Sequence, residues 1–261
     1  MILDRFRLDN RVAIVTGSGR GIGAGTARAL AEVGADVVCA ARTLEQIEAV
    51  AQEIRASGRR ALPIACDVND RAQLDNLVAR TVQEFGRIDI VVNNAGGSPP
   101  CEALYTSEQM FEEAFHFNVT SAFVLTRLCV PHMLKTGGGA VVNISSGAGR
   151  YPIAGFVAYG TAKAALSFMT RILGHEFAPR VRVNAIAVGA VETTALGQFL
   201  DDDLRGKMEA LTPMRKIGTV EDIAIAALFL ASPASRWVTG KVFEIDGGSE
   251  TSNWPFAPPT I

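Results

Sequence analysis

Short apolar runs alternate with longer segments of helical periodicity from one end of the chain to the other. The apolar runs contain nearly continuous Val, Ile and Ala, which is typical of strands that are buried on both faces of a sheet. Strands are expected at residues 12–15, 37–40, 61–65, 88–92, 140–144, 181–186 and 241–245. Helices are expected at residues 21–33, 44–56, 70–85, 107–135, 156–177 and 219–231. This alternation predicts an α/β fold, a doubly wound parallel sheet with helices on both faces.

No linker, repeat or break in composition interrupts this pattern, so residues 1–261 are expected to form a single domain. The tail over 249–261 differs in character, because it carries Trp254, Phe256 and several prolines. Such a composition suits an extended arm that packs on a surface. The pattern leaves open whether that surface belongs to the same subunit or to a neighbour.

Composition narrows the classes of function. Hydrophobic residues make up 48% of the chain and the formal net charge is −2, with no strongly basic or acidic block. This argues against nucleic acid or an anionic membrane as the main partner. The first residues lack the apolar stretch of a signal peptide and no apolar run is long enough to span a bilayer, so a cytoplasmic protein is expected. Its four cysteines and three histidines lack the spacing of metal ligands, and no metal site is expected.

A glycine-rich loop follows the first predicted strand and opens the first predicted helix. Glycine in such a loop lets the backbone turn tightly and approach a pyrophosphate, whose charge is met by the helix N-terminus. This context, at the start of a strand–helix–strand unit, predicts dinucleotide binding. The predicted contacts in the loop are Gly17, Ser18, Gly19, Arg20, Gly21, Ile22 and Gly23.

The end of the second strand indicates which nicotinamide cofactor is bound. An acidic residue there accepts hydrogen bonds from a ribose 2′-hydroxyl, whereas an arginine favours a 2′-phosphate. The chain has Ala40-Ala41-Arg42-Thr43 at this point, and Arg20 in the glycine loop could hold the same phosphate from the other side. NADP(H) is therefore preferred, with NAD(H) as the alternative. Two solvent-facing arginines would give the same pattern.

Tyr159 and Lys163 stand four residues apart in a run with the pattern of an amphipathic helix. Residues with this spacing lie on the same helix face, one turn apart. The ammonium group is therefore expected to lower the pKa of the phenol from its ordinary value of about 10. A tyrosine tuned in this way can act as general acid or base near neutral pH. A solvated surface pair would show the same spacing, so the pair needs support from other motifs.

In the order and spacing of several motifs the sequence resembles the short-chain dehydrogenase/reductase family, over roughly residues 8–248. The resemblance implies a Rossmann-type sheet of about seven strands, a nicotinamide cofactor, hydride transfer that interconverts a ketone and a secondary alcohol, and usually a homotetramer. The motifs are Thr16-Gly17 with Gly21 and Gly23, Asp67-Val68, Asn93-Asn94-Ala95-Gly96, Asn118, Ser145-Ser146, Tyr159 with Lys163, and Asp246-Gly247-Gly248.

The same resemblance implies roles for individual residues. Tyr159 would donate or accept the proton, and Lys163 would tune its pKa and hold the nicotinamide ribose. Ser146, thirteen residues before Tyr159, would orient and polarise the substrate carbonyl. Asn118 would hold a water that links Lys163 to solvent. The cofactor contacts implied outside the glycine loop and Arg42 are Asp67, Val68, Asn94, Ala95, Gly96, Tyr159, Lys163, Gly189, Val191 and Thr193.

Three segments are expected to line the substrate pocket, namely residues 97–104, residues 147–156 and a lid over 194–211. They offer Arg150 as the main fixed charge and many apolar side chains, which favours an apolar substrate over a polyhydroxy sugar. Packing of loop against loop is the alternative explanation. Val188 stands where the family usually has a proline, which removes no chemical group. The expected apolar lining is Pro99, Pro100, Leu104, Tyr151, Ile153, Phe156, Leu196 and Phe199.

Two enzymatic interpretations compete. In the first the substrate is a 3-oxoacyl thioester of acyl carrier protein or CoA; carrier-protein reductases tend to show basic residues before the fifth strand and after the catalytic helix. Lys135 is the basic residue near the first place and Arg180 occupies the second. In the second interpretation, which is slightly favoured, the substrate is a steroid-like or other bulky apolar ketone or secondary alcohol. A third hypothesis, a non-catalytic nucleotide-binding module, predicts a decayed Ser/Tyr/Lys set, whereas the set is complete.

Overall fold

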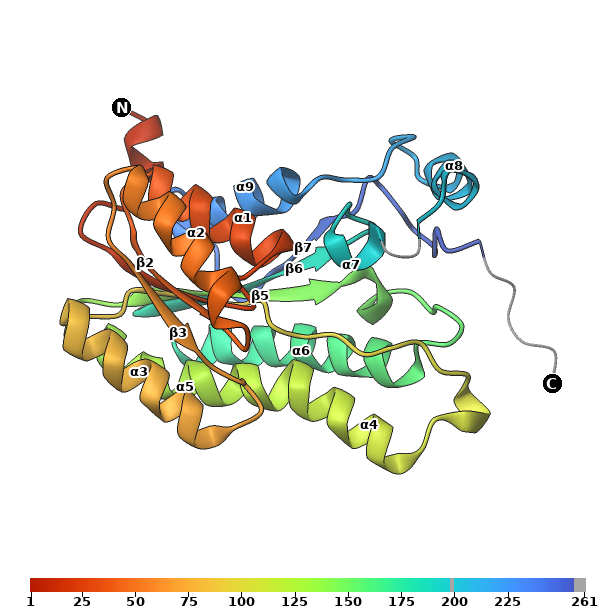
Figure 1. The fold of residues 1–261 in the computed structure, drawn as a ribbon, viewed down its shortest axis with the longest axis horizontal. Coiled ribbons are helices and arrows are strands. Elements are labelled where there is room, and N and C mark those ends of the chain that lie inside the picture. Colours follow the sequence, from red (N-terminus) through yellow and green to blue (C-terminus); the bar gives the residue numbers. More distant parts are fainter. Residues whose placement is uncertain (198–199, 256–261) are drawn as a thin grey trace.

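In a computed structural model, which describes residues 1–197 and 200–255, the chain folds around a seven-stranded parallel sheet (Figure 1). The strand order is β3-β2-β1-β4-β5-β6-β7, so the direction in which strands are added reverses after β3, when the chain crosses from one edge back to the centre. The predicted doubly wound parallel sheet is thereby confirmed. Its strands are β1 (Val12–Thr16), β2 (Asp36–Ala41), β3 (Ala61–Ala65), β4 (Ile90–Asn93), β5 (Gly139–Ser146), β6 (Val181–Val188) and β7 (Val242–Ile245).

Helices cover both faces of the sheet. One face carries α1, α2 and α9, and the other carries α3, α5 and α6, with α4 running into α5 (Figure 1). No helix within residues 1–197 and 200–255 combines the length and apolar character needed to cross a membrane. The helices are α1 (Gly21–Glu32), α2 (Leu44–Ala56), α3 (Arg71–Phe85), α4 (Glu108–Phe115), α5 (Ser121–Lys135), α6 (Val157–Glu176), α7 (Thr194–Gly197), α8 (Asp202–Leu211) and α9 (Val220–Ala231).

The sheet separates two apolar cores. Successive side chains of a strand point to opposite faces, so Ala13 and Val15 of β1 pack with α1, α2 and α9, while Val12 and Ile14 pack with α3, α5 and α6. All four side chains are buried. Burial on both faces explains why the strand sequences show apolar runs instead of polar alternation.

The fourth strand begins later than the sequence predicted, at Ile90 instead of residue 88. The buried carboxylate of Asp89 accepts hydrogen bonds from Arg11 Nη1 (2.8 Å), Arg87 Nε (2.7 Å) and the backbone N–H of Val12 (2.9 Å). The Asp89 side chain therefore binds two arginines and a backbone N–H at the amino edge of the sheet. Regular strand geometry starts one residue later, at Ile90.

The long helical segment predicted over 107–135 is helical from Glu108 to Lys135, but a π-helical turn at His116–Thr120 separates α4 from α5. The backbone N–H of Ser121 donates to the carbonyl of His116, five residues back, and the Ser121 hydroxyl donates to the carbonyl of Phe117 (2.7 Å). The hydrogen bonds of a π-turn span five residues instead of the four of an α-helix, and such turns are often found at functional sites. Asn118 lies in this turn.

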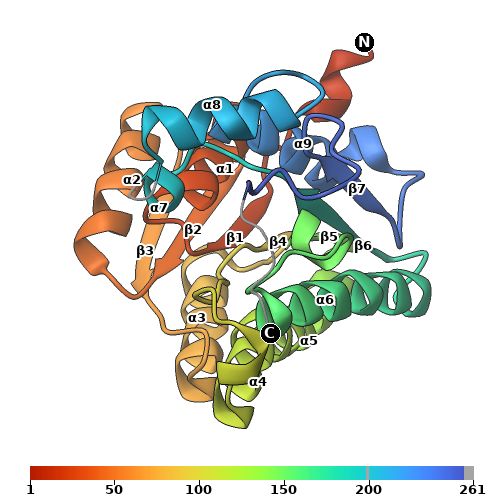
Figure 2. The same ribbon diagram turned by 90° about the vertical axis from the view of Figure 1, so that its right-hand side faces the viewer.

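Two segments lie over the carboxyl edge of the sheet, where the strands end (Figure 2). The first contains α7 and α8, within the predicted lid over 194–211. The second is the C-terminal segment, here the part of the predicted arm from Ser249 to Pro255. Phe199 and residues 256–261 lie outside the described residues. The functions of lid and arm stay predictions at this point.

Candidate active site

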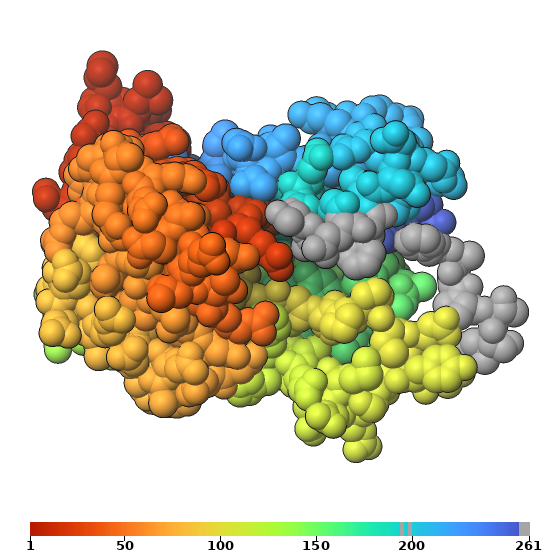
Figure 3. All heavy atoms as spheres, viewed as in Figure 1, coloured from red at the N-terminus to blue at the C-terminus, as the bar shows by residue number. Residues whose placement is uncertain are grey.

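A cavity of about 1070 Å³ follows the carboxyl edge of the sheet, beneath the segment that contains α7 and α8 (Figure 3). Its floor is made of the loops that follow β1 to β6. A crevice at the carboxyl ends of the strands is where doubly wound sheets bind ligands. Residues predicted from the sequence that line the cavity are Gly17, Gly19, Arg20, Gly21, Ile22, Arg42, Asp67, Val68, Asn94, Ala95, Gly96, Ser146, Tyr159, Lys163, Gly189, Val191 and Thr193.

The glycine loop adopts the tight geometry that a dinucleotide requires. Gly17 has φ +63° and Gly21 has φ +53°, a left-handed conformation that favours glycine. A Cβ atom at Gly23 would lie 2.3 Å from the carbonyl oxygen of Gly17, so glycine alone lets α1 approach the loop this closely. Gly21 and Ile22, the first residues of α1, line the cavity. The positive end of the helix dipole therefore points at the cavity, and the loop fits a pyrophosphate.

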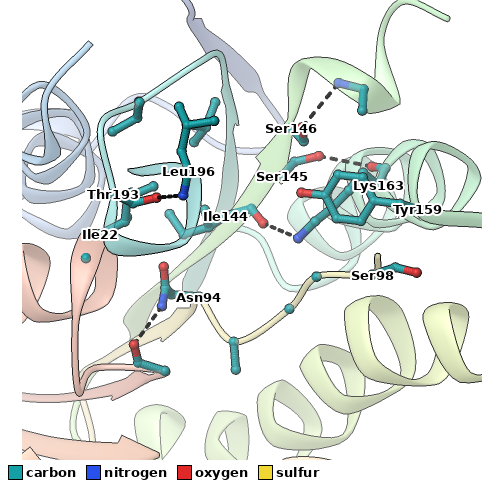
Figure 4. Close-up of a pocket in the computed structure, with 18 of the residues that line it drawn as sticks. Ile22, Asn94, Ser98, Ile144, Ser145, Ser146, Tyr159, Lys163, Thr193 and Leu196 are labelled. Carbon is teal, nitrogen blue, oxygen red and sulfur yellow. Dashed lines mark hydrogen bonds between the residues drawn. The ribbon is translucent and has the colours of Figure 1, made fainter. Parts of the chain in front are cut away.

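Asn94 joins the loop after β4 to the glycine loop. Its Nδ2 donates to the carbonyl oxygens of Thr16 (2.9 Å) and Gly17 (3.2 Å), and Thr16 Oγ1 accepts from the backbone N–H groups of Asn94 (3.0 Å) and Ala95 (3.1 Å). Figure 4 shows Asn94 beside the end of β1. These bonds hold two walls of the cavity in one rigid arrangement.

Arg20 and Arg42 lie at the same end of the cavity. Both side chains are exposed and line the cavity, Arg20 from the glycine loop and Arg42 from the end of β2. Neither forms an ion pair with any residue in the described ranges 1–197 and 200–255. Their guanidinium groups are thus available to an anion at this end. Asp67 and Val68, after β3, line the cavity nearby.

Tyr159 and Lys163 lie on α6 and face the end of β5, where Ser146 lines the cavity (Figure 4). Lys163 is 3% exposed and its Nζ donates to the carbonyl oxygen of Ile144 at 2.8 Å. Its Nζ also lies 5.6 Å from the centroid of the Tyr159 ring. The Lys163 side chain, which was expected to pair with the Tyr159 phenol, is therefore hydrogen-bonded to β5.

A second joint holds α6 against β5. The hydroxyl of Ser145 donates to the carbonyl oxygen of Lys163 (3.0 Å) and contacts Ser167 Oγ at 2.8 Å. Ser145 is 2% exposed, so these bonds are protected from water. Because Ser145 and Ser146 are adjacent on β5, the joint sets the position of Tyr159 and Lys163 relative to Ser146.

The pKa values in this group differ from the sequence prediction. Burial raises the pKa of the Tyr159 phenol, and hydrogen bonding to Ser146 lowers it only in part. Burial lowers the pKa of the Lys163 ammonium to about 8. The predicted lowering of the Tyr159 pKa is therefore wrong for this structure. Lys163 Nζ is turned to the carbonyl of Ile144, and the loss of hydration on burial is the largest influence on the pKa of both groups.

Asn118 supports the loop beneath Lys163 and does not itself line the cavity. Its Oδ1 accepts from the backbone N–H of Gly97 (2.9 Å), and its Nδ2 donates to the carbonyl oxygens of Gly97 (2.9 Å) and Ala114 (2.8 Å). Gly96 separates Asn118 from Lys163. A Cβ atom at Gly96 would lie 2.6 Å from Asn118 Oδ1 and 3.0 Å from Lys163 Nζ.

Two further predicted contacts lie behind the cavity wall. Ser18 is fully buried, and its backbone N–H and hydroxyl both face the carbonyl oxygen of Ala40, at 3.3 and 3.5 Å. Gly23 packs against Gly17 inside the loop, as described above. Both residues shape the loop from behind, whereas their neighbours reach the cavity. No group of His, Cys, Asp or Glu side chains arranged to hold a metal ion occurs among residues 1–197 and 200–255.

The outer part of the cavity differs from the predicted substrate lining. Leu104 is 77% exposed, and neither it nor Ile153 lines the cavity. The predicted fixed charge, Arg150, is also outside the lining, because its guanidinium pairs with Glu244 (3.0 Å) and Asp246 (3.4 Å) at the end of β7. The predicted residues that do line it are Pro99, Pro100, Tyr151, Phe156 and Leu196.

Four further side chains line this outer part without having been singled out from the sequence. Leu204 and Met208 come from α8, within the predicted lid, and Asn253 and Trp254 come from the C-terminal segment, which was not expected to line the cavity. An aromatic residue in a proline-rich tail is a weak signal, and the sequence alone did not show which surface the tail would cover.

Dinucleotide-dependent oxidoreductases are a class of protein that combines such a glycine loop with titratable side chains in one cavity. Residues 17–250 match the family model described as enoyl-(acyl carrier protein) reductase. The chain belongs to the short-chain dehydrogenase/reductase family, as the sequence predicted, and is an NAD(P)-dependent oxidoreductase acting on CH–OH groups.

Relatives support this assignment over the whole chain. The chain is 50% identical to an uncharacterized oxidoreductase from Mycobacterium tuberculosis (strain CDC 1551 / Oshkosh), over 100% of both proteins. It is 37% identical to the 7alpha-hydroxysteroid dehydrogenase of Escherichia coli (strain K12), over 94% of this chain and 96% of that protein. It is 35% identical to a 3-oxoacyl-[acyl-carrier-protein] reductase from Thermotoga maritima, over 93% of this chain and 99% of that protein.

Solved structures show the same fold with both cofactors. A 7 alpha-hydroxysteroid dehydrogenase complexed with NADH and 7-oxo glycochenodeoxycholic acid matches with a TM-score of 0.92 and 37% identity, over 95% of this chain and 97% of that one. A gluconate 5-dehydrogenase from Burkholderia cenocepacia, in complex with NADP and tartrate, matches with a TM-score of 0.89 and 33% identity, over 95% and 98%. The cofactor of this family member is NAD(H) or NADP(H), and its substrate is a small carbonyl compound or alcohol.

Proposed function

We propose that the protein interconverts a mainly apolar ketone and its secondary alcohol, with NADP(H) as the preferred cofactor. The observation that carries this proposal is the apolar wall around the outer part of the cavity. Lys163 is the charged residue among the described lining on this side, since Arg20, Arg42 and Asp67 belong to the glycine-loop end. Such a wall favours apolar ligands and excludes water. It consists of Pro99, Pro100, Tyr151, Phe156, Leu196, Leu204, Met208 and Trp254.

Ser146 and Tyr159 are proposed to act on the oxygen of the substrate. When bound, the nicotinamide supplies the hydride in reduction and accepts it in oxidation. Tyr159 Oη gives its proton to the developing alkoxide in reduction and takes a proton from the alcohol in the reverse direction. The Ser146 hydroxyl donates a hydrogen bond that stabilises the negative charge on this oxygen. Lys163, fixed by Ile144, favours the phenolate that remains on Tyr159 after the proton has left.

Asn118 is proposed to help return a proton to this group from solvent. Its Oδ1 accepts one hydrogen bond from Gly97 and has a second lone pair, which can accept from a water molecule. Gly96 supports this role, because any side chain there would collide with Asn118 Oδ1 and Lys163 Nζ. Asn118 also holds the loop after β4 in place, so it acts as a positioning residue.

The preference for NADP(H) is proposed from the charge at the other end of the cavity. A 2′-phosphate is an anion, and Arg20 and Arg42 are two cations exposed to the cavity wall. Ala41 stands at the end of β2, where an acidic side chain would bind a ribose 2′-hydroxyl. This arrangement supports a phosphate more than a hydroxyl at that position.

A second candidate function is reduction of a 3-oxoacyl thioester. It is supported by the description of the matching family model and by the relative from Thermotoga maritima. Lys135 and Arg180 are exposed and come just before β5 and β6, at the amino edge of the sheet, so within one subunit they lie opposite the cavity. This position gives the thioester interpretation less support than the apolar wall gives the ketone interpretation.

We also propose that the protein is a cytoplasmic homotetramer. Apolar side chains on α5 and α6 are exposed in the single chain, with Phe123 40%, Phe168 62% and Ile172 50% exposed. Association of subunits would remove this surface from water. The four cysteines are unpaired, which suits a reducing compartment. Sedimentation analysis of the purified protein tests the assembly, and a monomer at micromolar concentration would contradict it.

The test of the proposed reaction is an activity panel of NADPH and NADH with carbonyl compounds that range from thioesters to steroid ketones. On the best substrate, Tyr159→Phe is expected to lower kcat by about 10²- to 10⁴-fold, because the general acid is removed. The dissociation constant for NADPH is expected to change far less than kcat, because the aromatic ring of residue 159 is kept. Tyr105→Phe is the matched control, since Tyr105 is 74% exposed. Full turnover by Tyr159→Phe would show that Tyr159 does not transfer the proton.

A further inference from the structure

The C-terminal segment, Ser249 to Pro255, is anchored at its start by Arg150. Arg150 Nη1 donates to the carbonyl oxygen of Ser249 at 2.7 Å, and Nη2 pairs with the carboxylate of Glu250. The same guanidinium pairs with Glu244 and Asp246. Ser249 itself is 3% exposed. The segment therefore leaves β7 in a fixed direction, along the loop that follows β5.

A buried hydrogen bond then joins this segment to the end of α8. Asn253 Nδ2 donates to Thr212 Oγ1 at 3.0 Å, and Thr212 Oγ1 donates to the carbonyl oxygen of Met208 at 2.8 Å. Asn253 is 4% exposed, Thr212 3% and Met208 fully buried. Asn253 and Met208 both line the cavity. The C-terminal segment and α8 consequently form one continuous wall over the outer part of the cavity.

Trp254 follows Asn253 and extends the aromatic lining outward from Tyr159. The ring centroids of Trp254 and Phe156 are 5.9 Å apart with an interplanar angle of 46°, and those of Phe156 and Tyr159 are 6.0 Å apart at 61°. Tilted and edge-to-face contacts at such distances are favourable between aromatic rings. All three side chains line the cavity. A substrate whose oxygen lies at Tyr159 has these rings along one side.

We propose that Trp254 is a specificity-determining residue that selects ketones and alcohols with a rigid, apolar ring system beside the reacting carbon. This inference rests on the proposed function. A rigid ring covers the flat indole without losing internal rotations, whereas a flexible acyl chain loses rotational freedom when it is ordered on the same surface. Indole also offers a large apolar area at little conformational cost of its own. Discrimination between cyclic and linear substrates follows from this difference.

The kinetic test compares bicyclic decalone with a linear methyl ketone of the same carbon number, under saturating NADPH. Wild type is expected to favour decalone. Trp254→Ala is expected to raise KM for decalone by about tenfold or more, with kcat nearly unchanged, and to change KM for the linear ketone by no more than about twofold. Trp254→Phe should restore most of the affinity. Trp237→Ala is the matched control, because Trp237 is 97% exposed and outside the cavity lining. Equal losses for both ketones in Trp254→Ala, or no preference in wild type, would overturn the proposal.

A binding test separates this inference from the proposed reaction. The chain has two tryptophans, so Trp237→Phe leaves Trp254 as the single indole reporter. Decalone added to this variant with NADP⁺ is expected to shift the emission of Trp254 without turnover, and the linear ketone is expected to shift it far less. No response to decalone would overturn the role of Trp254. A response to decalone in a protein that reduces no carbonyl compound would support the binding role and contradict the proposed reaction instead.

Discussion

At the glycine-loop end of the cavity the wall is largely backbone, whereas at the Trp254 end it consists of apolar side chains from separate segments. Residues 17–23 and the loop after β4 form the first wall, and hydrogen bonds from Asn94 and Thr16 join them. The second wall combines the loops after β4 and β5 with α7, α8 and the C-terminal segment. The first wall thus depends on two stretches of backbone that lie close together, and the second depends on the side chains that five separate segments contribute.

The difference predicts unequal tolerance to change. An added methyl group at Gly23 has no space, whereas Gly197 in α7 and Gly206 in α8 have no atom within 4 Å of an added Cβ. The cofactor end should therefore accept few substitutions, and the outer wall should accept many, with altered substrate preference as the main consequence.

The largest expected contrast is between two glycine substitutions. Gly23→Ala is expected to lower the free energy of unfolding by about 1–3 kcal/mol through overpacking and to weaken NADPH binding strongly. Gly206→Ala, in the exposed middle of α8, is expected to raise the free energy of unfolding by up to about 1 kcal/mol. Urea unfolding and NADPH titration measure both effects. Equal behaviour of the two variants would refute the contrast between the walls.

The next effect concerns the charge at the cofactor end. Arg42→Asp is expected to lower kcat/KM for NADPH by about 10- to 100-fold and to improve use of NADH, because a charge-assisted hydrogen bond is replaced by repulsion. Arg236→Asp makes the same change of charge at an exposed site outside the cavity lining and serves as control. Steady-state kinetics measure kcat/KM for NADPH and NADH in wild type and both variants. Identical cofactor ratios in Arg42→Asp and wild type would remove Arg42 from the proposal.

The last contrast concerns the stability of the protein at Lys163, where the two parts of the cavity meet. Its pKa is about 8 in the folded protein against an ordinary value of 10.5, so between these values the unfolded chain binds more protons. The stability of wild type should therefore rise with pH over this window, and the cost of the buried charge is fully present below about pH 8. Lys163→Met removes this cost and is expected to be more stable at pH 7 by about 1–2 kcal/mol, after loss of the bond to Ile144.

Urea unfolding at pH 7 and near pH 10 measures this difference. The gain in Lys163→Met should shrink at the higher pH, while carbonyl reduction is lost at both. Lys135→Met, at an exposed lysine, is the control and should show no comparable change with pH. A variant that is less stable than wild type at pH 7 would show that the bond from Lys163 to Ile144 outweighs the cost of burial.

The difference between the glycine-loop end and the Trp254 end of the cavity also explains which features could be predicted from the sequence. The glycine loop and the spacing of Tyr159 and Lys163 are local patterns, and buried strands are recognised as apolar runs. The fold and the residues that line the glycine-loop end of the cavity could therefore be predicted from the sequence. The contact between Asn253 and Thr212 joins residues 41 apart, without any periodic signal, and it places Trp254 in the outer wall. No local pattern shows which distant segments tertiary packing brings together.

The predictions about charged and titratable side chains were the other ones that the structure corrected. A loop arginine such as Arg150 can bind a substrate only if its guanidinium is not already paired with carboxylates of the protein. Its partners Glu244, Asp246 and Glu250 come from the far end of the chain, so their contact with Arg150 could not be predicted from local sequence. The spacing of Tyr159 and Lys163 was correct, but the pKa direction depended on the carbonyl of Ile144 and on burial. Neither the contact with Ile144 nor the degree of burial can be predicted from the spacing of two residues on one helix.

The joint made by Ser145 has a practical consequence for redesign. It fastens the backbone of Lys163 to β5, below the level at which α8 and the C-terminal segment cover the cavity. Ser146, Tyr159 and Lys163 are therefore held by β5 and α6, whereas Leu204, Met208 and Trp254 of the outer wall come from other parts of the chain. Exchanging α8 and the C-terminal segment for those of another family member is a route to new substrates that leaves the hydrogen bonds between β5 and α6 in place.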